Sequence, residues 1–295
     1  MIIMKVPAFE IIGSRDGAVA IVEFRNSISN LNKRKIAKEI ITRHKNVKSV
    51  LAKASARKGK YRKRSYELIL GDENTEVLHI ENGYRLLVDP QKTYFSPRES
   101  TERLRICEMV KKGEDVAIFF AGVGPFAIAI GKKTKAHSVV GIELNPNAVK
   151  YFEENIRLNK LKNVKAVNGD VKGAAKKYKN SFDRIVMPLP ESSHKFLKQA
   201  EMCGKKNAIV HYYCFCREDD GANLTSRMHG RSSERRASAR QCVFGTSFHS
   251  DVHTPSDLKE LIRKTIKRKV RFSGVQKVLP WGPGIYKMRI DFKIV

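Results

Sequence analysis

The sequence predicts an α/β protein in which an open, mostly parallel sheet is preceded by a small α+β domain. Residues 116–120 form a short, continuously apolar run, which suits a strand that is buried on both faces of a parallel sheet. A glycine turn with Gly122 and Gly124 follows, and a second apolar run, residues 127–130, comes directly after it. Another apolar strand, residues 138–142, then leads into an acidic residue.

The turn and this acidic residue have a spacing that is typical of nucleoside-binding folds. Neither Gly122 nor Gly124 has a Cβ atom, so the backbone can turn sharply and approach a ligand. Glu143 lies about 20 residues beyond the turn, where a carboxylate accepts hydrogen bonds from ribose hydroxyls. Because the turn lacks a third glycine at the dinucleotide spacing, a smaller nucleoside is favoured over NAD. On these residues alone, an ordinary tight turn is the alternative.

Two further strands are expected to end at the same edge of the sheet. Residues 163–170 predict a third strand that ends at Asp170. Residues 182–190 predict a fourth, which Pro188 and Pro190 stop because proline cannot extend a ladder. Ligands in open α/β sheets bind at the carboxyl ends of the strands. The ends of these strands therefore outline one candidate site.

The charge of the chain favours a polyanionic partner. The 295 residues include 58 Lys and Arg against 30 Asp and Glu, a formal net charge of +28. This excess predicts salt-dependent binding to phosphates, and an anionic membrane surface is the competing partner. No apolar run approaches the ~20 residues that span a bilayer, and the N-terminus lacks a signal-peptide pattern. We therefore expect a cytoplasmic protein.

The cysteines and histidines do not suggest a metal site. The 5 cysteines are odd in number and lack zinc-finger spacing, so reduced thiols are expected. His229, His249 and His253 have no convincing ligand frame. We therefore expect no metal.

The first 90 residues predict the small α+β domain. Residues 18–24 are rich in β-formers, and residues 33–43 carry apolar side chains at helical spacing. Further strands are expected at residues 47–52, 66–70 and 84–88. Between them, residues 56–64 are strongly basic and include a tyrosine that can stack on a base. RNA contact is favoured for this run, and a solvated loop is the alternative.

A second domain is expected from residue 91 to 295. It starts with Tyr94-Phe95-Ser96-Pro97-Arg98 and a helix that carries Glu102 and Arg103. Capping of this helix by Ser100, with the acidic residues near its positive end, is the structural explanation for the cluster. Residues 257–268 predict a basic amphipathic helix, and residues 270–295 predict two strands around a Pro-Trp-Gly-Pro-Gly loop. Trp281 in that loop is suited to base stacking or to core packing.

Several of these motifs, taken in order, resemble the archaeal and eukaryotic tRNA (guanine-37-N1)-methyltransferases. The resemblance covers nearly the whole chain and is closest to the archaeal subgroup of the wyosine pathway. The motifs that carry it are Tyr61-Arg62-Lys63-Arg64, residues 94–98 with Glu102-Arg103, residues 120–126, Met187-Pro188-Leu189-Pro190 and Val210-His211-Tyr212-Tyr213. The family's additional N-terminal domain is not expected, because the chain starts directly in its second unit.

The resemblance implies a Rossmann-like class I methyltransferase domain that uses S-adenosylmethionine and acts on the anticodon loop of tRNA. Glu102 corresponds to the proposed base that removes the guanine N1 proton, and Arg62 to the arginine that neutralises charge on the base. The implied catalytic residues are Arg62, Glu102, Arg103 and Pro188. The implied cofactor-binding residues are Tyr94, Arg103, Phe120, Ala121, Gly122, Val123, Gly124, Glu143, Leu144, Asn145, Asp170, Val171 and Pro188. The expected RNA-binding residues are Arg57, Lys58, Lys60, Arg62, Arg64 and Arg98, and a monomer is expected.

The sequence departs from the family pattern at two positions. Ile118 stands where members usually carry an acidic residue before the glycine turn, and Pro188 stands where many have an asparagine that hydrogen-bonds the target base. Loss of a polar group would widen the pocket and relax its selectivity. The Met-Pro-Leu-Pro form resembles the archaeal wyosine-pathway subgroup, and this resemblance implies a second reaction, methylation of C7 of 4-demethylwyosine.

Three other functions stay open on the sequence. A wyosine-pathway aminocarboxypropyl transferase would share the fold and the cofactor. A non-catalytic tRNA-binding protein would tolerate both departures, and membrane-surface binding has only the charge in its favour. Residues 219–250 resemble no family element, have no apolar period and contain many arginines. We expect a poorly ordered insertion there, with RNA contact as a hypothesis.

Overall fold

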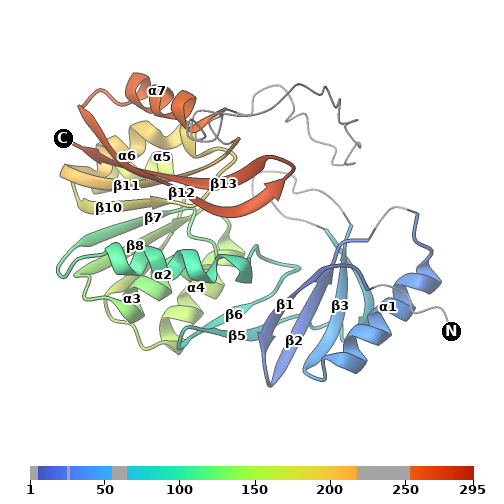
Figure 1. Ribbon diagram of the computed structural model, residues 1–295. Helices are drawn as coiled ribbons and strands as arrows, with labels where there is room; N and C mark the ends of the chain where they lie inside the picture. The colour runs from blue at the N-terminus through green and yellow to red at the C-terminus, as the bar shows by residue number, and fades with distance from the viewer. Residues whose placement is uncertain (1–5, 25–26, 55–64, 218–252) are drawn as a thin grey trace, which may run out of the picture.

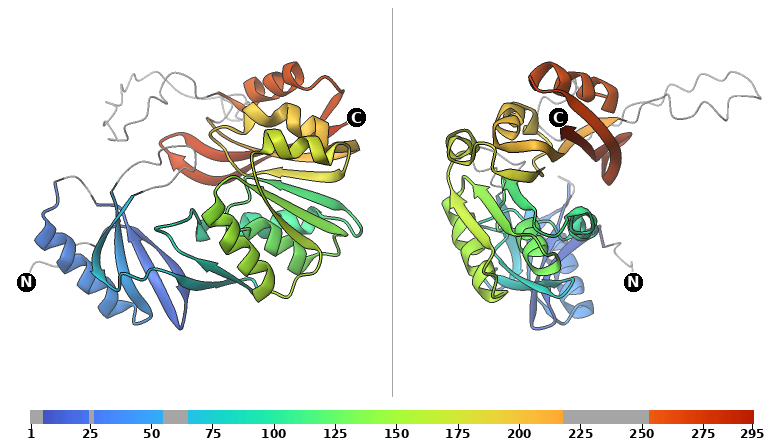
Figure 2. Two further views of the ribbon diagram at one scale, coloured as in Figure 1. Left: turned by 180° about the vertical axis from the view of Figure 1, so that it is seen from behind. Right: turned by 90° about the vertical axis from the view of Figure 1, so that its left-hand side faces the viewer.

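The computed structural model describes residues 6–24, 27–54, 65–217 and 253–295. The predicted RNA-binding residues Arg57, Lys58, Lys60, Arg62 and Arg64 lie outside the described residues, as does the insertion predicted at 219–250. The small sheet and its helix lie beside the large sheet, on the side toward which the C-terminal hairpin reaches (Figures 1 and 2).

The N-terminal part is a four-stranded sheet covered by one helix. Its elements are β1 (Phe9–Ser14), β2 (Gly17–Val22), α1 (Asn30–Arg43), β3 (Val47–Lys53) and β4 (Tyr66–Gly71), in the sheet order β1-β2-β3-β4. Strands β2 and β3 are parallel and α1 connects them, so the helix folds back over the sheet. Ser29 caps α1, because its side chain accepts a hydrogen bond from the backbone N–H of Asn32.

A hairpin joins the two sheets through a shared core. It consists of β5 (Val77–Glu81) and β6 (Tyr84–Val88), which pair antiparallel. One apolar cluster contains Ile21 and Leu51 of the small sheet, Leu86 of the hairpin, and Ile118 and Phe126 of the following part. The second face of the small sheet is therefore buried against the rest of the molecule. The two parts share one continuous core.

The large sheet has seven strands in the order β12-β13-β11-β10-β7-β8-β9. The strands are β7 (Asp115–Phe119), β8 (Ser138–Glu143), β9 (Val164–Asn168), β10 (Phe182–Met187), β11 (Gly204–Arg217), β12 (Val270–Gly282) and β13 (Ile285–Ile294). Strands β7 to β11 run parallel, and the β12–β13 hairpin adds to β11 antiparallel. The four predicted strands and the closing hairpin are confirmed.

Helices cover both faces of this sheet. The first face carries α2 (Ser100–Met109), α3 (Pro125–Lys133) and α4 (Pro146–Leu158), and the second carries α5 (Val171–Ala174), α6 (Leu197–Cys203) and α7 (Pro255–Thr265). Among the described residues, three short 3-10 turns complete the elements: η1 (Pro97–Glu99), η2 (Ala175–Tyr178) and η3 (Ser193–Phe196). On β7, Ile118 packs into the first apolar cluster and Phe119 into the second. Burial on both faces explains the continuous apolar run of this strand.

Two local predictions about helices need correction. Ser100 does not cap α2: it is the first helical residue, and its hydroxyl accepts a hydrogen bond of 2.9 Å from Asn82. The helix predicted at residues 257–268 is α7 and spans Pro255–Thr265. It starts earlier because Thr254 and Asp257 form a reciprocal capping box around Pro255.

Within the described residues, no helix is both long and apolar enough to cross a membrane.

Candidate active site

The glycine turn between β7 and α3 has the backbone conformation that its residues require. Gly122 and Gly124 both have positive φ angles, 57° and 83°. A Cβ atom on Gly124 would lie 2.0 Å from Cδ2 of Phe152, so only glycine allows α4 to pack this closely. A Cβ atom on Gly122 would meet only the carbonyl oxygen of Tyr94, at 3.8 Å. The turn is therefore tightly packed against α4, and Gly122 faces the backbone of Tyr94 at van der Waals distance.

Glu143 lies at the end of β8 and is tied to this turn. One carboxylate oxygen accepts a hydrogen bond of 2.8 Å from the backbone N–H of Gly122, and the other accepts one of 2.8 Å from the N–H of Asn145. Burial raises the pKa of the Glu143 carboxyl, although these backbone N–H groups act to lower it. Each oxygen keeps a lone pair for another donor.

The other predicted cofactor residues at these strand ends mostly serve as caps and packing. The side chain of Asp170 accepts a hydrogen bond of 2.9 Å from Lys172 N–H and caps α5, and Asn145 caps α4 in the same way through Asn147. Ala121, Val123 and Val171 are buried, and Leu144 is half-buried. Phe120 packs edge-on against Phe196, with the ring centroids 4.8 Å apart. Tyr94 is largely exposed, with 47% of its surface accessible.

The end of β10 is fixed by a serine hydroxyl. Ser193 is fully buried, and its Oγ lies 3.0 Å from the carbonyl oxygen of Met187 and 2.7 Å from that of Leu189. Pro188, which lies between these two carbonyls, is half-buried. The Met-Pro-Leu-Pro segment is therefore held against η3 at the carboxyl end of the strand.

Glu102 lies in the first turn of α2 and is almost completely buried, with 2% of its surface exposed. Its Oε1 atom accepts a hydrogen bond of 2.7 Å from the hydroxyl of Tyr213 and another from Arg289. Its Oε2 atom lies 3.5 Å from Arg105. Burial and the neighbouring carboxylate raise the pKa of the Tyr213 hydroxyl well above its ordinary value, so Tyr213 stays protonated as a donor.

A chain of buried polar side chains continues from Glu102 across the sheet. Arg289 also binds Asp291, which accepts a hydrogen bond of 2.6 Å from Nδ1 of His211. Burial lowers the pKa of His211, and Arg184 donates to its Nε2 at 2.7 Å, so the imidazole is neutral with its proton on Nδ1. Arg184 in turn binds Glu114. Every charged group in this row of buried, hydrogen-bonded side chains therefore has a partner.

Arg103, the neighbour of Glu102, is engaged elsewhere. Its guanidinium binds both carboxylate oxygens of Glu81 at 2.6 Å and the carbonyl oxygen of Ser96 at 3.3 Å. Burial opposes the charge on Glu81, but hydrogen bonds from His79, Arg103 and Tyr84 lower the pKa of Glu81 to about 2. With 1% of its surface exposed, Arg103 ties α2 to the β5–β6 hairpin.

The sequence did not single out several residues that hold Glu102. In the sequence Tyr213 stands only within a family motif, and no pattern there assigns a role to Arg289 or Asp291. A signal was present in β13, where Lys287, Arg289 and Asp291 alternate with the apolar Met288 and Ile290. Alternation of this kind suggests a strand with one solvated face. The polar face is instead buried against α2, because Lys287 pairs with Glu99 and Arg289 with Glu102.

Arg98, which the sequence predicts to bind RNA, lies at the surface. Arg98 is exposed and 3.7 Å from Glu10 of β1. In the described part of the chain, no group of three or more His, Cys, Asp or Glu residues is placed to hold a metal ion.

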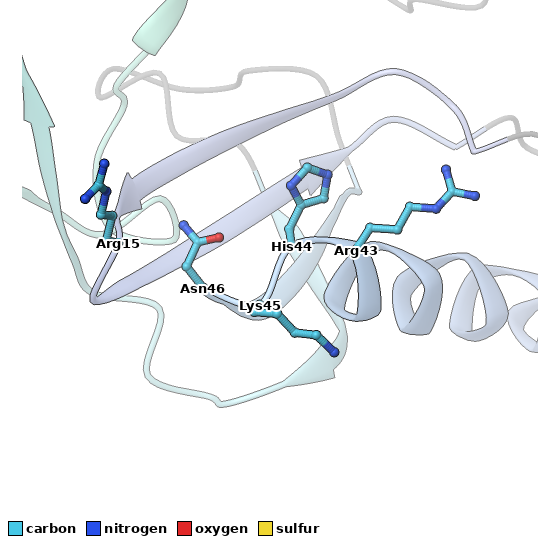
Figure 3. Close-up of a pocket in the computed structure, with 5 residues that line it drawn as sticks. All are labelled: Arg15, Arg43, His44, Lys45 and Asn46. Carbon is cyan, nitrogen blue, oxygen red and sulfur yellow. The ribbon is translucent and has the colours of Figure 1, made fainter.

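A shallow depression of about 480 Å³ lies in the N-terminal part, lined by Arg15, Arg43, His44, Lys45 and Asn46. Figure 3 shows that Lys45 points away from Arg15 and Asn46. Arg43 already pairs with Glu39. The side chains do not converge on one point, so we assign no site there.

Comparison with known proteins adds a second line of support. Residues 77–236 match the family model for the TRM5/TYW2 methyltransferase domain, and residues 6–75 match the TYW2 N-terminal domain. The tRNA (guanine(37)-N(1))-methyltransferase Trm5b of Pyrococcus abyssi is 43% identical over 213 residues, which cover 72% of this chain and 61% of that protein. This match thus spans about three fifths of the relative's length. The crystal structure of Trm5b superposes with a TM-score of 0.75 at 35% identity, covering 98% of this chain and 75% of that one.

Two relatives carry other names. The Nanoarchaeum equitans tRNA (guanine(37)-N(1))/4-demethylwyosine(37)-methyltransferase Taw22 is 32% identical over 240 residues, 63% of this chain and 79% of that protein. The Pyrococcus horikoshii tRNA(Phe) (4-demethylwyosine(37)-C(7)) aminocarboxypropyltransferase is 37% identical over 168 residues, 57% and 59% of the two chains. The Rossmann-like fold predicted from the sequence is confirmed by the superposition and by the strand order. With its catalytic-domain match, its fold and its preceding small domain, the chain belongs to the TRM5/TYW2 methyltransferase family.

Proposed function

We propose that the protein methylates N1 of guanine 37 in tRNA, with S-adenosylmethionine as the methyl donor. The observation that carries this proposal is the segment from Tyr94 to Glu102, which connects the glycine turn with the start of α2. At one end the carbonyl of Tyr94 lies next to Gly122 of the glycine turn. At the other end Glu102 is held by Tyr213 and Arg289. A nucleoside at the turn and a base at Glu102 would therefore be neighbours.

The residues at the turn fit the nucleoside part of S-adenosylmethionine. The Glu143 carboxylate already accepts one backbone N–H on each oxygen, which aims the remaining lone pairs at a ribose diol. Gly122 places no side chain between the backbone and the ligand, and the rings of Tyr94 and Phe120 are proposed to face the same ligand. When bound, the sulfonium supplies an electrophilic methyl group.

Glu102 is the proposed general base. Guanine N1 is a poor nucleophile until its proton is removed, so a carboxylate must reach it. Because Oε1 is occupied by Tyr213 and Arg289, Oε2, which Arg105 contacts only at 3.5 Å, is the atom that would accept the proton. These two donors hold the carboxylate in one orientation, and positioning of this kind contributes much of the rate in a displacement reaction. Arg62, proposed to neutralise O6 of the base, lies outside the described residues.

We assign Arg103 a positioning role. Its guanidinium is fully engaged with Glu81 and Ser96, so it acts on the reaction by fixing the start of α2, and thereby Glu102. Pro188, whose carbonyl neighbours are fixed by Ser193, would shape the wall of the base pocket without donating a hydrogen bond.

A second methylation, of C7 in 4-demethylwyosine, is the natural extension, because one relative is named for both reactions. Aminocarboxypropyl transfer is the main alternative, since another relative carries that name. A tRNA-binding protein without catalysis is the third. Methylation and aminocarboxypropyl transfer move different groups from the same sulfonium compound, so an isotopic label distinguishes the two reactions.

The test uses S-adenosylmethionine labelled either in the methyl group or in the methionine carboxyl group. Each is incubated with tRNA that carries guanine 37 and with tRNA that carries 4-demethylwyosine. We expect methyl label in N1-methylguanosine and no carboxyl label in either tRNA. Carboxyl label in the tRNA would establish aminocarboxypropyl transfer instead. If tRNA binds but takes up label from neither form of S-adenosylmethionine, the protein is a tRNA-binding protein without catalysis.

The remaining expectations about organisation are also proposals. We propose a division near residue 90, although the β5–β6 hairpin contributes Leu86 to the core shared by both sheets. Light scattering of the purified chain tests the proposed monomer. Fractionation of cells that express the protein tests the proposed cytoplasmic location.

A further inference from the structure

The chain contains a single tryptophan, and it is not buried in the core. Trp281, near the end of β12, has 53% of its surface exposed. Its ring lies over that of Phe215 on β11, with centroids 4.3 Å apart and an angle of 31° between the planes. The sequence alone is compatible with two roles for Trp281, core packing and base stacking. The structure shows an aromatic pair on the surface.

The strand register places this pair next to Glu102. Tyr213 of β11 is paired with Arg289 of β13, and these are the two residues that hold Glu102. Phe215 is paired with Lys287, two residues farther along the same strands. Residues two apart on a strand share a face and lie about 7 Å apart. The aromatic pair therefore occupies the next row of the same face.

This row also lies beyond the end of the neighbouring strand. The last residue of β10, Met187, is paired with Tyr212, so Phe215 extends past the carboxyl end of β10. That end is the edge where open α/β sheets bind ligands. The β12–β13 hairpin that carries Trp281 reaches beyond the other strands toward the small sheet (Figure 1 and the left view of Figure 2).

Resting on the proposed function, we propose that Trp281 and Phe215 form a stacking platform for an unpaired nucleobase of tRNA close to the target guanine. Bases of single-stranded loops are recognised by stacking on aromatic rings, and this contact tolerates any base. In the adjoining rows, Lys287 and Arg289 are buried and already paired with Glu99 and Glu102, so the platform acts through its aromatic surface. With a net charge of +28, the protein favours an RNA ligand over a protein surface here.

The single tryptophan makes the test direct. Because Trp281 is the only tryptophan, its fluorescence reports this contact alone. Titration with unmodified tRNA is expected to quench the emission in a saturable way. A blunt-ended RNA duplex without unpaired bases serves as the control ligand and is expected to leave the emission nearly unchanged. Binding of both RNAs is followed separately with an end-labelled RNA.

Substitutions give a second readout. Trp281→Ala is expected to weaken tRNA binding about 5- to 100-fold, the effect of losing one stacked base, while S-adenosylmethionine binds as before. Trp281→Phe is expected to keep most of the affinity, because the ring is retained. Val275→Ala, at another exposed apolar position of β12, is the matched control and is expected to change nothing.

The outcomes separate this proposal from the proposed function. If labelled tRNA binds and is methylated but the emission stays constant and Trp281→Ala binds normally, the stacking platform is refuted and methylation stands. Contact of the aromatic pair with a protein partner would then be the remaining explanation for its exposure. If no tRNA binds to the wild-type protein at all, both proposals fail together, and the labelled-RNA assay shows it independently of the fluorescence.

Discussion

The two sides of the candidate site, the glycine turn with Glu143 and the hairpin side with Glu102, are built in different ways. On the glycine-turn side, Glu143 is held by backbone N–H groups only 21 and 2 residues away in the chain. On the hairpin side, Glu102 is held by side chains 111 and 187 residues away, Tyr213 and Arg289. The first carboxylate is positioned by local backbone geometry, and the second by the assembled tertiary structure.

This difference predicts which side of the candidate site tolerates amino-acid substitutions better. Among substitutions only proline removes a backbone N–H, so the Glu143 contacts survive other substitutions as long as the turn keeps its shape. The Glu102 contacts depend on individual side chains in a buried charge network. Such a network is strongly destabilised when one partner is removed and the other is left behind. Substitutions on the hairpin side should therefore have the larger effects.

The largest effect is expected for Glu102→Gln. The amide keeps the shape and can still accept from Tyr213, but it cannot take the N1 proton, so single-turnover methyl transfer should slow about 10²- to 10⁴-fold. Binding of S-adenosylmethionine should stay unchanged. Glu108→Gln, an exposed change on the same helix, is the control. Wild-type rates in Glu102→Gln would refute its role as the base.

The next effect concerns stability. Arg289→Met leaves Glu102 buried without its cation and should lower the free energy of unfolding by about 3–5 kcal/mol. Arg289→Lys keeps the charge and should lose less, while Arg271→Met, exposed on β12, should lose little. Urea unfolding measures all three. Equal stability of Arg289→Met and Arg271→Met would show that the hairpin side is no more sensitive than the surface.

A smaller effect is expected on the glycine-turn side. Glu143→Gln replaces one acceptor oxygen with an NH₂ group, so one ribose hydroxyl and one backbone N–H lose their acceptor. The Kd for S-adenosylhomocysteine should rise about 10- to 100-fold in calorimetry, with tRNA affinity retained. Glu153→Gln, exposed on α4, is the matched control. The ribose assignment fails if both variants bind alike.

The smallest effect should appear in the pH dependence of stability. Burial lowers the pKa of His211 below its ordinary value of 6.5, so the unfolded chain binds its proton more readily than the folded one. The stabilisation is present above pH 6.5 and is lost as the pH falls through the folded-state pKa. His211→Gln should flatten the decline in unfolding free energy between pH 7.5 and 5, while the exposed His137→Gln should keep it. A slope unchanged in His211→Gln would contradict this account.

Much of the glycine-turn half could be predicted from the sequence, because its determinants are local. The apolar run of β7, Gly122 and Gly124, and the distance to Glu143 lie within one βαβ unit. The prediction that Ser100 caps α2 is wrong because a contact from outside the helix decides its role. Its residue type suits a cap, but its hydroxyl accepts from Asn82 of the β5–β6 hairpin, a tertiary contact that outweighs the local preference.

The sequence by itself determined the strands, the parallel sheet with its closing hairpin, the tight turn and the basic character, since these follow from apolar periodicity, residue conformation and composition. Only the tertiary structure decided that Arg103 binds Glu81, that Tyr213 and Arg289 hold Glu102, and that Trp281 lies on Phe215 at the surface. These contacts join residues far apart in the chain. Their geometry depends on the order in which strands pair in the sheet, which single-strand patterns do not encode.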